Sequence, residues 1–203
     1  MTATPQRRRT STEARILQAT TTLLSDGQRY AELPVERILQ LAKVSRSTFY
    51  QWFPDKTALI QRVAQPGVEE FLAASDSWWT RSDGGSADTL ADIVTQMLAL
   101  ARASAPIWRA YLETASSDSE FGATLREATE TYTRKMAARL DRERHDGLVP
   151  AEVDTSQTAR FIVTTMRASF IEALTAGHTT EDERFARTLG RVFWLSMYRP
   201  IAP

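Results

Sequence analysis

Apolar residues recur every three or four positions along most of the chain, which is the spacing of one face of an α-helix. No stretch shows the strict alternation of apolar and polar residues that marks a half-buried strand. Proline and glycine fall mostly between the periodic segments rather than inside them. The pattern therefore predicts an all-α fold of about nine helices.

The periodic segments, together with capping residues and breaks, give approximate bounds for each expected helix. They are Ser11–Asp26, Pro34–Ala42, Arg46–Trp52, Lys56–Trp79, Ala87–Ser104, Pro106–Ser116, Glu120–Arg144, Asp154–Ala176 and Glu181–Tyr198. Ser11 or Thr12 is expected to cap the first helix, and Ser45 the third. Pro34 is expected in the first turn of the second helix.

The two short helices before residue 54 are joined by a brief turn, which is the arrangement of a helix-turn-helix. The second helix of that motif reads bases in the major groove of DNA. Arg46 can donate two hydrogen bonds to guanine, and Ser47 can hydrogen-bond with donors or acceptors on base edges. The hydroxyls of Thr48 and Tyr50 and the ammonium of Lys56 can donate hydrogen bonds to phosphate oxygens. The alternative is an ordinary helical hairpin with a solvated polar face.

The residues of this segment resemble the DNA-binding signature of the TetR family of transcriptional regulators. The matching features are Val44-Ser45 at the end of the turn, Thr48-Phe49-Tyr50, the aromatic pair Trp52-Phe53, and Lys56 three residues before Leu59. The resemblance covers about residues 12–62, and the nearest subgroup resembles the EthR-type regulators. Two departures are Lys43, where the family usually has glycine, and Leu39, where it usually has a small residue.

The resemblance implies an all-α homodimer that binds a double-stranded DNA operator and a small molecule. Three parts are expected: a flexible basic arm (1–10), a helix-turn-helix DNA-binding domain (11–62), and a ligand-binding and dimerisation domain (63–203). The implied DNA-binding residues are Ser45, Arg46, Ser47, Thr48, Tyr50, Trp52 and Lys56. The last two long helices are expected to dimerise, and their apolar faces are wider than one core contact requires.

Charge is divided unevenly, although the formal net charge is zero. Residues 1–62 contain ten Lys or Arg and five Asp or Glu. The remaining residues contain fifteen Lys or Arg and twenty Asp or Glu. A basic N-terminal part is typical of contact with a polyanion, although chance gives such a difference as well. Arg7-Arg8-Arg9 is expected either to reach the minor groove or phosphates, or to form a solvated tail.

Aromatic residues in the later part are candidates for a pocket that takes a small apolar or weakly polar effector. The predicted effector-binding residues are Trp108, Tyr111, Tyr132, Phe161, Thr164, Phe170 and Phe193. The alternative for each aromatic residue is the core of a helical bundle.

Several classes of function are not expected from the composition. The chain has no cysteine and two histidines, and it lacks a Gly-rich phosphate loop, so neither catalysis, a metal site nor a cofactor is expected. No apolar run reaches the length that spans a bilayer, and no secretory signal is recognisable, so a cytoplasmic protein is expected. The sequence predicts a ligand-responsive repressor released from a pseudo-palindromic operator; an activator or a non-catalytic helical interaction protein remains the alternative.

Overall fold

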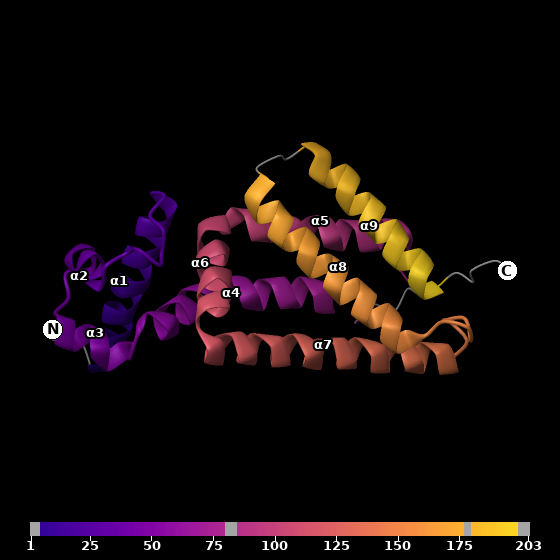
Figure 1. Cartoon of the computed structure of the whole chain (residues 1–203), viewed down its shortest axis with the longest axis horizontal. Coiled ribbons are helices and arrows are strands. Elements are labelled where there is room, and N and C mark those ends of the chain that lie inside the picture. The colour runs from indigo at the N-terminus through magenta and orange to yellow at the C-terminus, as the bar shows by residue number, and fades with distance from the viewer. Residues whose placement is uncertain (1–4, 80–84, 177–179, 199–203) are drawn as a thin grey trace. The chain divides into compact units, whose positions relative to one another are not determined.

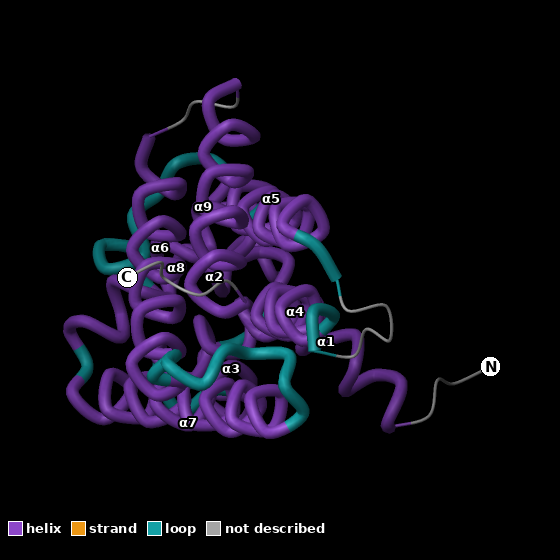
Figure 2. The backbone as a smooth tube through the Cα atoms, turned by 90° about the vertical axis from the view of Figure 1, so that its right-hand side faces the viewer, coloured by secondary structure: helices purple, strands orange, loops and turns teal. Residues whose placement is uncertain are grey.

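The computed structural model describes residues 5–79, 85–176 and 180–198. These residues form nine α-helices joined by short loops and contain no strand (Figures 1 and 2). The helices are α1 (Pro5–Ser25), α2 (Val35–Ala42), α3 (Arg46–Trp52), α4 (Lys56–Asp76), α5 (Ala87–Ala103), α6 (Ala105–Ser117), α7 (Ser119–His145), α8 (Thr155–Ala176) and α9 (Thr180–Tyr198). The all-α prediction is confirmed.

Most helix ends agree with the predicted ones to within one or two residues, apart from the start of α1 and the end of α4. Helix α1 begins at Pro5, so Ser11 and Thr12 lie inside it and do not cap it. Proline is favourable in a first helical turn and arginine is a good helix former, which explains the earlier start. Pro34 is the extended residue that precedes α2, not a member of its first turn.

The chain divides into two compact units. Unit 1 comprises residues 1–66 and 104–122, and unit 2 comprises residues 67–103 and 123–203. The boundary expected at residue 62 assigns α6 to the second domain, whereas its contacts group α6 with α1–α3 in unit 1. Helix α4 contributes to both units, and its division follows Pro66, the one proline inside that helix.

Unit 1 has a continuous apolar core drawn from α1, α2, α3, α4 and α6. Ile16, Ile38, Phe49 and Leu59 have no exposed surface, and they come from α1, α2, α3 and α4 respectively. Ala110 brings α6 into the same core. Burial of this kind, not helix propensity, stabilises short helices such as α2 and α3.

In unit 2, α9 packs against α5, and Figure 1 shows the two helices crossing. Gly190 allows the two backbones to approach closely, because a Cβ atom there would lie 2.6 Å from the backbone of Ala91. Core residues from α7 and α8 complete the unit, among them Leu140 and Phe170. No helix in the described part of the chain is both long and apolar enough to cross a membrane.

We expect Gly190→Ala to destabilise the protein by about 1–3 kcal/mol, because the added methyl group meets rigid backbone rather than a movable side chain. Gln96→Ala, on the exposed face of α5, is the control and should stay within about 0.5 kcal/mol of the unsubstituted chain. Urea unfolding measures both. Equal midpoints for the two variants would contradict the close approach of α5 and α9.

Candidate nucleic-acid interface

The turn between α2 and α3 has a left-handed residue at Lys43, with φ 54° and ψ 49°. It is the one non-glycine residue with positive φ among those described. The Lys43 and Val44 amides donate to the carbonyl oxygens of Gln40 and Leu39, so the turn satisfies the end of α2. The chain therefore adopts the conformation that glycine favours, with a side chain that is strained there.

Ser45 caps α3, as the sequence predicts. Its hydroxyl oxygen accepts a hydrogen bond from the Thr48 amide at 3.1 Å. The Thr48 hydroxyl lies 2.8 Å, and the Ser47 hydroxyl 3.0 Å, from the same oxygen. These hydroxyls thus form one cluster at the start of the helix, which fixes the first turn in place.

Helix α3 has one buried face and one exposed face. Phe49 and Phe53 lie in the core of unit 1 with 0 % and 4 % of their surface exposed. Arg46, Ser47 and Tyr50 are exposed on the other side. A short helix held by two buried aromatic rings thus presents a cation and hydroxyl groups to the surroundings, which suits contact with base edges and phosphates.

Arg46 is not isolated on that face. Its Nη1 donates to the Glu36 carboxylate of α2 at 2.6 Å, and its guanidinium carbon lies 5.7 Å from the centre of the Tyr50 ring. Sequence spacing alone gives no sign of the Glu36 contact, because the two residues lie ten positions apart on different helices.

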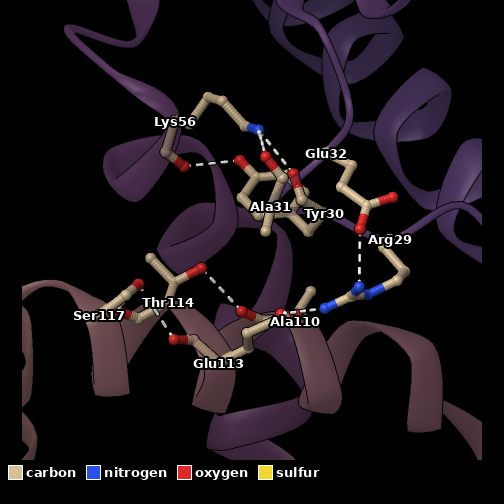
Figure 3. A network of polar contacts seen from close by, with 9 residues as sticks. All are labelled: Arg29, Tyr30, Ala31, Glu32, Lys56, Ala110, Glu113, Thr114 and Ser117. Carbon is tan, nitrogen blue, oxygen red and sulfur yellow. Dashed lines mark hydrogen bonds and ion pairs between the residues drawn. The ribbon is translucent and has the colours of Figure 1, made fainter.

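Lys56 and Tyr30 hold each other at the start of α4 (Figure 3). The Lys56 ammonium donates to the carbonyl oxygens of Tyr30, Ala31 and Leu33, at 2.5, 3.3 and 2.8 Å. In return, the Tyr30 hydroxyl donates to the Lys56 carbonyl at 2.6 Å, and the ammonium lies 4.7 Å from the Tyr30 ring centre. We call this set of contacts the Lys56–Tyr30 clasp.

Burial shifts both titrating groups of the clasp. It raises the pKa of the Tyr30 hydroxyl and lowers the pKa of the Lys56 ammonium from their ordinary values. The three carbonyl acceptors favour the charged form of Lys56 and so oppose the effect of burial. An ammonium has three N–H groups, and all three have carbonyl acceptors here, so a phosphate contact by Lys56, as predicted, requires it to release one of them.

The remaining predicted DNA-binding residue, Trp52, is half-buried and packs against the core of unit 1. It is the last residue of α3, whereas Arg46 is the first. Its position supports the helix, and the predicted contact with the DNA backbone stays a prediction.

Two further contacts join α6 and the start of α7 to the rest of unit 1. Arg29 bridges Glu32 and Glu113, at 2.6 and 3.0 Å (Figure 3). Thr57 donates to the carboxylate of Asp118 at 2.9 Å. The same carboxylate accepts from the backbone amides of Phe121 and Glu120 at the start of α7. The Phe121 amide, followed by the Thr57 hydroxyl and then the Glu120 amide, lowers the pKa of Asp118. Sequence analysis missed these contacts because the partners lie 84 and 61 positions apart.

The predicted effector-binding residues lie in separate places. Trp108 and Tyr111 are in unit 1, where their rings meet edge to face at 5.8 Å. In unit 2, Tyr132 and Ser75 share a hydrogen bond between their hydroxyl groups. Phe170, also in unit 2, meets Phe71 at 4.9 Å.

The other three of these residues belong to α8 and α9. Phe161 is 44 % exposed and meets the buried ring of Phe193 at 6.2 Å. Thr164 is exposed on the same side of α8 as Phe161. Among the seven, the structure thus brings together Trp108 with Tyr111 and Phe161 with Phe193, whereas Tyr132 and Phe170 contact residues outside the set. The joint role of the seven stays a prediction.

The described residues hold no cluster of three or more His, Cys, Asp or Glu side chains suited to a metal ion. His145 lies in the last turn of α7. The loop that contains His178 lies outside the described residues, as does the tail from 199. The side chains of Arg7, Arg8 and Arg9 are not described either, so the two interpretations of the basic segment stay open.

The described architecture is that of an all-α protein with a helix-turn-helix near its N-terminus, and it is the fold of TetR-family transcriptional regulators. No protein-family model and no curated protein matches the chain. Solved structures do match. GusR of Salmonella enterica is 21 % identical over 92 % of this chain and 95 % of its own, with a TM-score of 0.68.

Two other solved structures share the fold. The TetR-family regulator PfmR of Thermus thermophilus is 16 % identical over 93 % of this chain and 99 % of its own, with a TM-score of 0.65. A TetR-like regulator of Rhodococcus sp. RHA1 is 16 % identical over 91 % and 94 %, with a TM-score of 0.63. At these identities the likeness shows the fold alone.

We expect Lys43→Gly to stabilise the protein by about 1 kcal/mol, because glycine adopts the left-handed conformation without the penalty of a Cβ atom. Lys43→Ala keeps the Cβ atom and removes the same charge, so it is the control and should show no such gain. Thermal and urea unfolding give the comparison. A gain of equal size in both variants would assign the effect to charge rather than to the backbone.

Lys56→Met removes the ammonium and retains much of the apolar stem. We expect it to destabilise the protein by about 1–3 kcal/mol, because half-buried carbonyl oxygens lose their donor. Tyr30→Phe removes one hydrogen bond only and should cost about 1 kcal/mol. Urea unfolding ranks the two variants, and a Lys56→Met variant as stable as the unsubstituted chain would contradict a structural role for the clasp.

Proposed function

We propose that this chain is a DNA-binding transcriptional regulator of the TetR family and that α3 is its recognition helix. The observation that carries the proposal is the exposed face of α3, where Arg46, Ser47 and Tyr50 stand on a helix fixed by buried Phe49 and Phe53. The shared fold supports it. The regulator is non-catalytic, and it acts in the cytoplasm, where its operator is accessible.

We further propose that the protein acts as a homodimer through α8 and α9. Phe161 and Ile171 of α8 are 44 % and 40 % exposed, and Phe185, Val192 and Leu195 of α9 are 41 %, 41 % and 49 % exposed. The same helices also carry buried core residues, such as Met166 and Phe193, so each of them has both exposed and buried apolar side chains. A dimer buries them and brings two recognition helices to half-sites about one helical turn, roughly 34 Å, apart.

The proposed mode is repression relieved by a small apolar or weakly polar effector. All but one of the seven predicted effector-binding residues are aromatic, which favours such a ligand. A ligand releases DNA only if it binds one conformation better than another, and a preference of about 1–3 kcal/mol is sufficient. The finer assignment to the EthR-type subgroup stays a prediction from the resemblance.

Selection of random duplex DNA on the purified protein at fixed, moderate salt, followed by sequencing, tests the proposal. We expect enrichment of a pseudo-palindrome with half-sites about 10 base pairs apart. Enrichment of a single half-site supports DNA binding and contradicts the dimer. Failure to enrich any sequence favours the alternative of a helical interaction protein.

The same selection with two variants tests the recognition helix. Arg46→Ala should weaken binding by about 1–3 kcal/mol and relax the preference at one base position of each half-site. Arg37→Ala removes an equal charge from the exposed surface of α2, so any loss it causes should be similar for all sequences. If Arg46→Ala retains the full base preference, Arg46 of α3 does not read DNA bases as proposed.

A further inference from the structure

Glu36 lies in the first turn of α2, and its carboxylate accepts a hydrogen bond from Nη1 of Arg46, the first residue of α3. The two groups are 2.6 Å apart. The side chains are 56 % and 64 % exposed, so water reaches both. An exposed ion pair contributes little to stability. Its main consequence is that it fixes the position of the Arg46 guanidinium.

A second contact restricts the same guanidinium. The Tyr50 ring lies 5.7 Å from its central carbon and is held edge to face against Phe49, with 5.3 Å between ring centres and planes at 86°. Phe49 has no exposed surface. The charged group of Arg46 is thus placed by a carboxylate from α2 and by an exposed ring that rests against buried Phe49.

This placement leaves capacity for another partner. A guanidinium carries five N–H groups in one plane, and the hydrogen bond to Glu36 uses one of them, on Nη1. The other edge of the fork, formed by Nη2 and Nε, matches two coplanar acceptors. Guanine offers such acceptors, O6 and N7, in the major groove, whereas adenine and cytosine offer a donor at one of the corresponding positions.

We propose that Glu36 is a positioning residue that orients Arg46 toward guanine and thereby sets the base specificity of the recognition helix. Glu36 does not contact DNA in this arrangement, and its carboxylate keeps its bond to Nη1 while the other edge of the guanidinium meets the base. The inference rests on the proposed function, because it assigns a role within the proposed DNA-reading site.

A Glu36 that competes with DNA for Arg46 would change DNA affinity in a different way. If Glu36 merely competed with DNA for Arg46, its removal would raise affinity for every sequence, and raise it most for the sites that Arg46 contacts. If Glu36 positions Arg46, removal of the Glu36 carboxylate leaves an arginine that binds phosphates and other bases as readily as guanine. The specificity ratio, not the affinity alone, separates the two roles.

The experiment compares Glu36→Gln with Glu32→Gln, measuring the dissociation constants for the selected operator and for a version whose Arg46-dependent guanines are replaced. Glu32 is a matched control, because it is an exposed carboxylate of unit 1, 67 % exposed, that pairs with Arg29 instead of Arg46. We expect Glu36→Gln to lower the ratio of the two affinities at least about fivefold, and Glu32→Gln to leave it unchanged within about twofold.

Arg46→Ala supplies the coupling test. In that background Glu36→Gln should no longer change the ratio, since the group that it positions is gone. A ratio equal to that of the unsubstituted chain, or a rise in affinity for both duplexes with no fall in the ratio, overturns the proposal. Failure of the unsubstituted chain to enrich any operator overturns the proposed function itself, so the two failures are distinguishable.

Discussion

The arrangement of unit 1 depends on one half-buried cation. The Lys56 ammonium donates hydrogen bonds to the carbonyl oxygens of Tyr30, Ala31 and Leu33, and the Tyr30 hydroxyl donates one to the Lys56 carbonyl. The segment it holds ends one residue before Pro34, and α2 begins directly after that. Since buried carbonyl groups without donors are costly, the clasp fixes where α2 starts relative to α4, and therefore where Glu36 lies.

The same end of unit 1 is tied to α6 and to the start of α7. Arg29, the neighbour of Tyr30, bridges to Glu113, and Thr57, the neighbour of Lys56, donates to Asp118. Each contact is exposed or half-buried and contributes little alone. Beside the shared apolar core they make α6 part of the unit that carries α3.

Local chemistry explains which parts of this molecule were predictable from its sequence. The bounds of α3 follow from Ser45 as its cap and from Phe49 and Phe53 on one face, and all of these signals lie within nine residues. Lys56 shows the limit of such reasoning, because an ammonium suits phosphate oxygens and backbone carbonyls equally. The carbonyls that it meets are set by folding and lie 23 to 26 positions away. Aromatic spacing likewise cannot separate Phe193, which is buried, from Phe161 on the exposed face of α8.

The likeness to solved regulators adds a further constraint on where specificity resides. Chains that share about a fifth of their residues or fewer retain this fold, so the core that positions α3 tolerates wide variation. Exposed residues of α3 carry little of the folding energy. A guanidinium on a flexible stem, however, discriminates between bases only when something fixes its plane. If Arg46 reads a base as proposed, the contacts from Glu36 and Tyr50 supply that restraint, and the identity of the base depends on the neighbouring helix α2 as well as on α3.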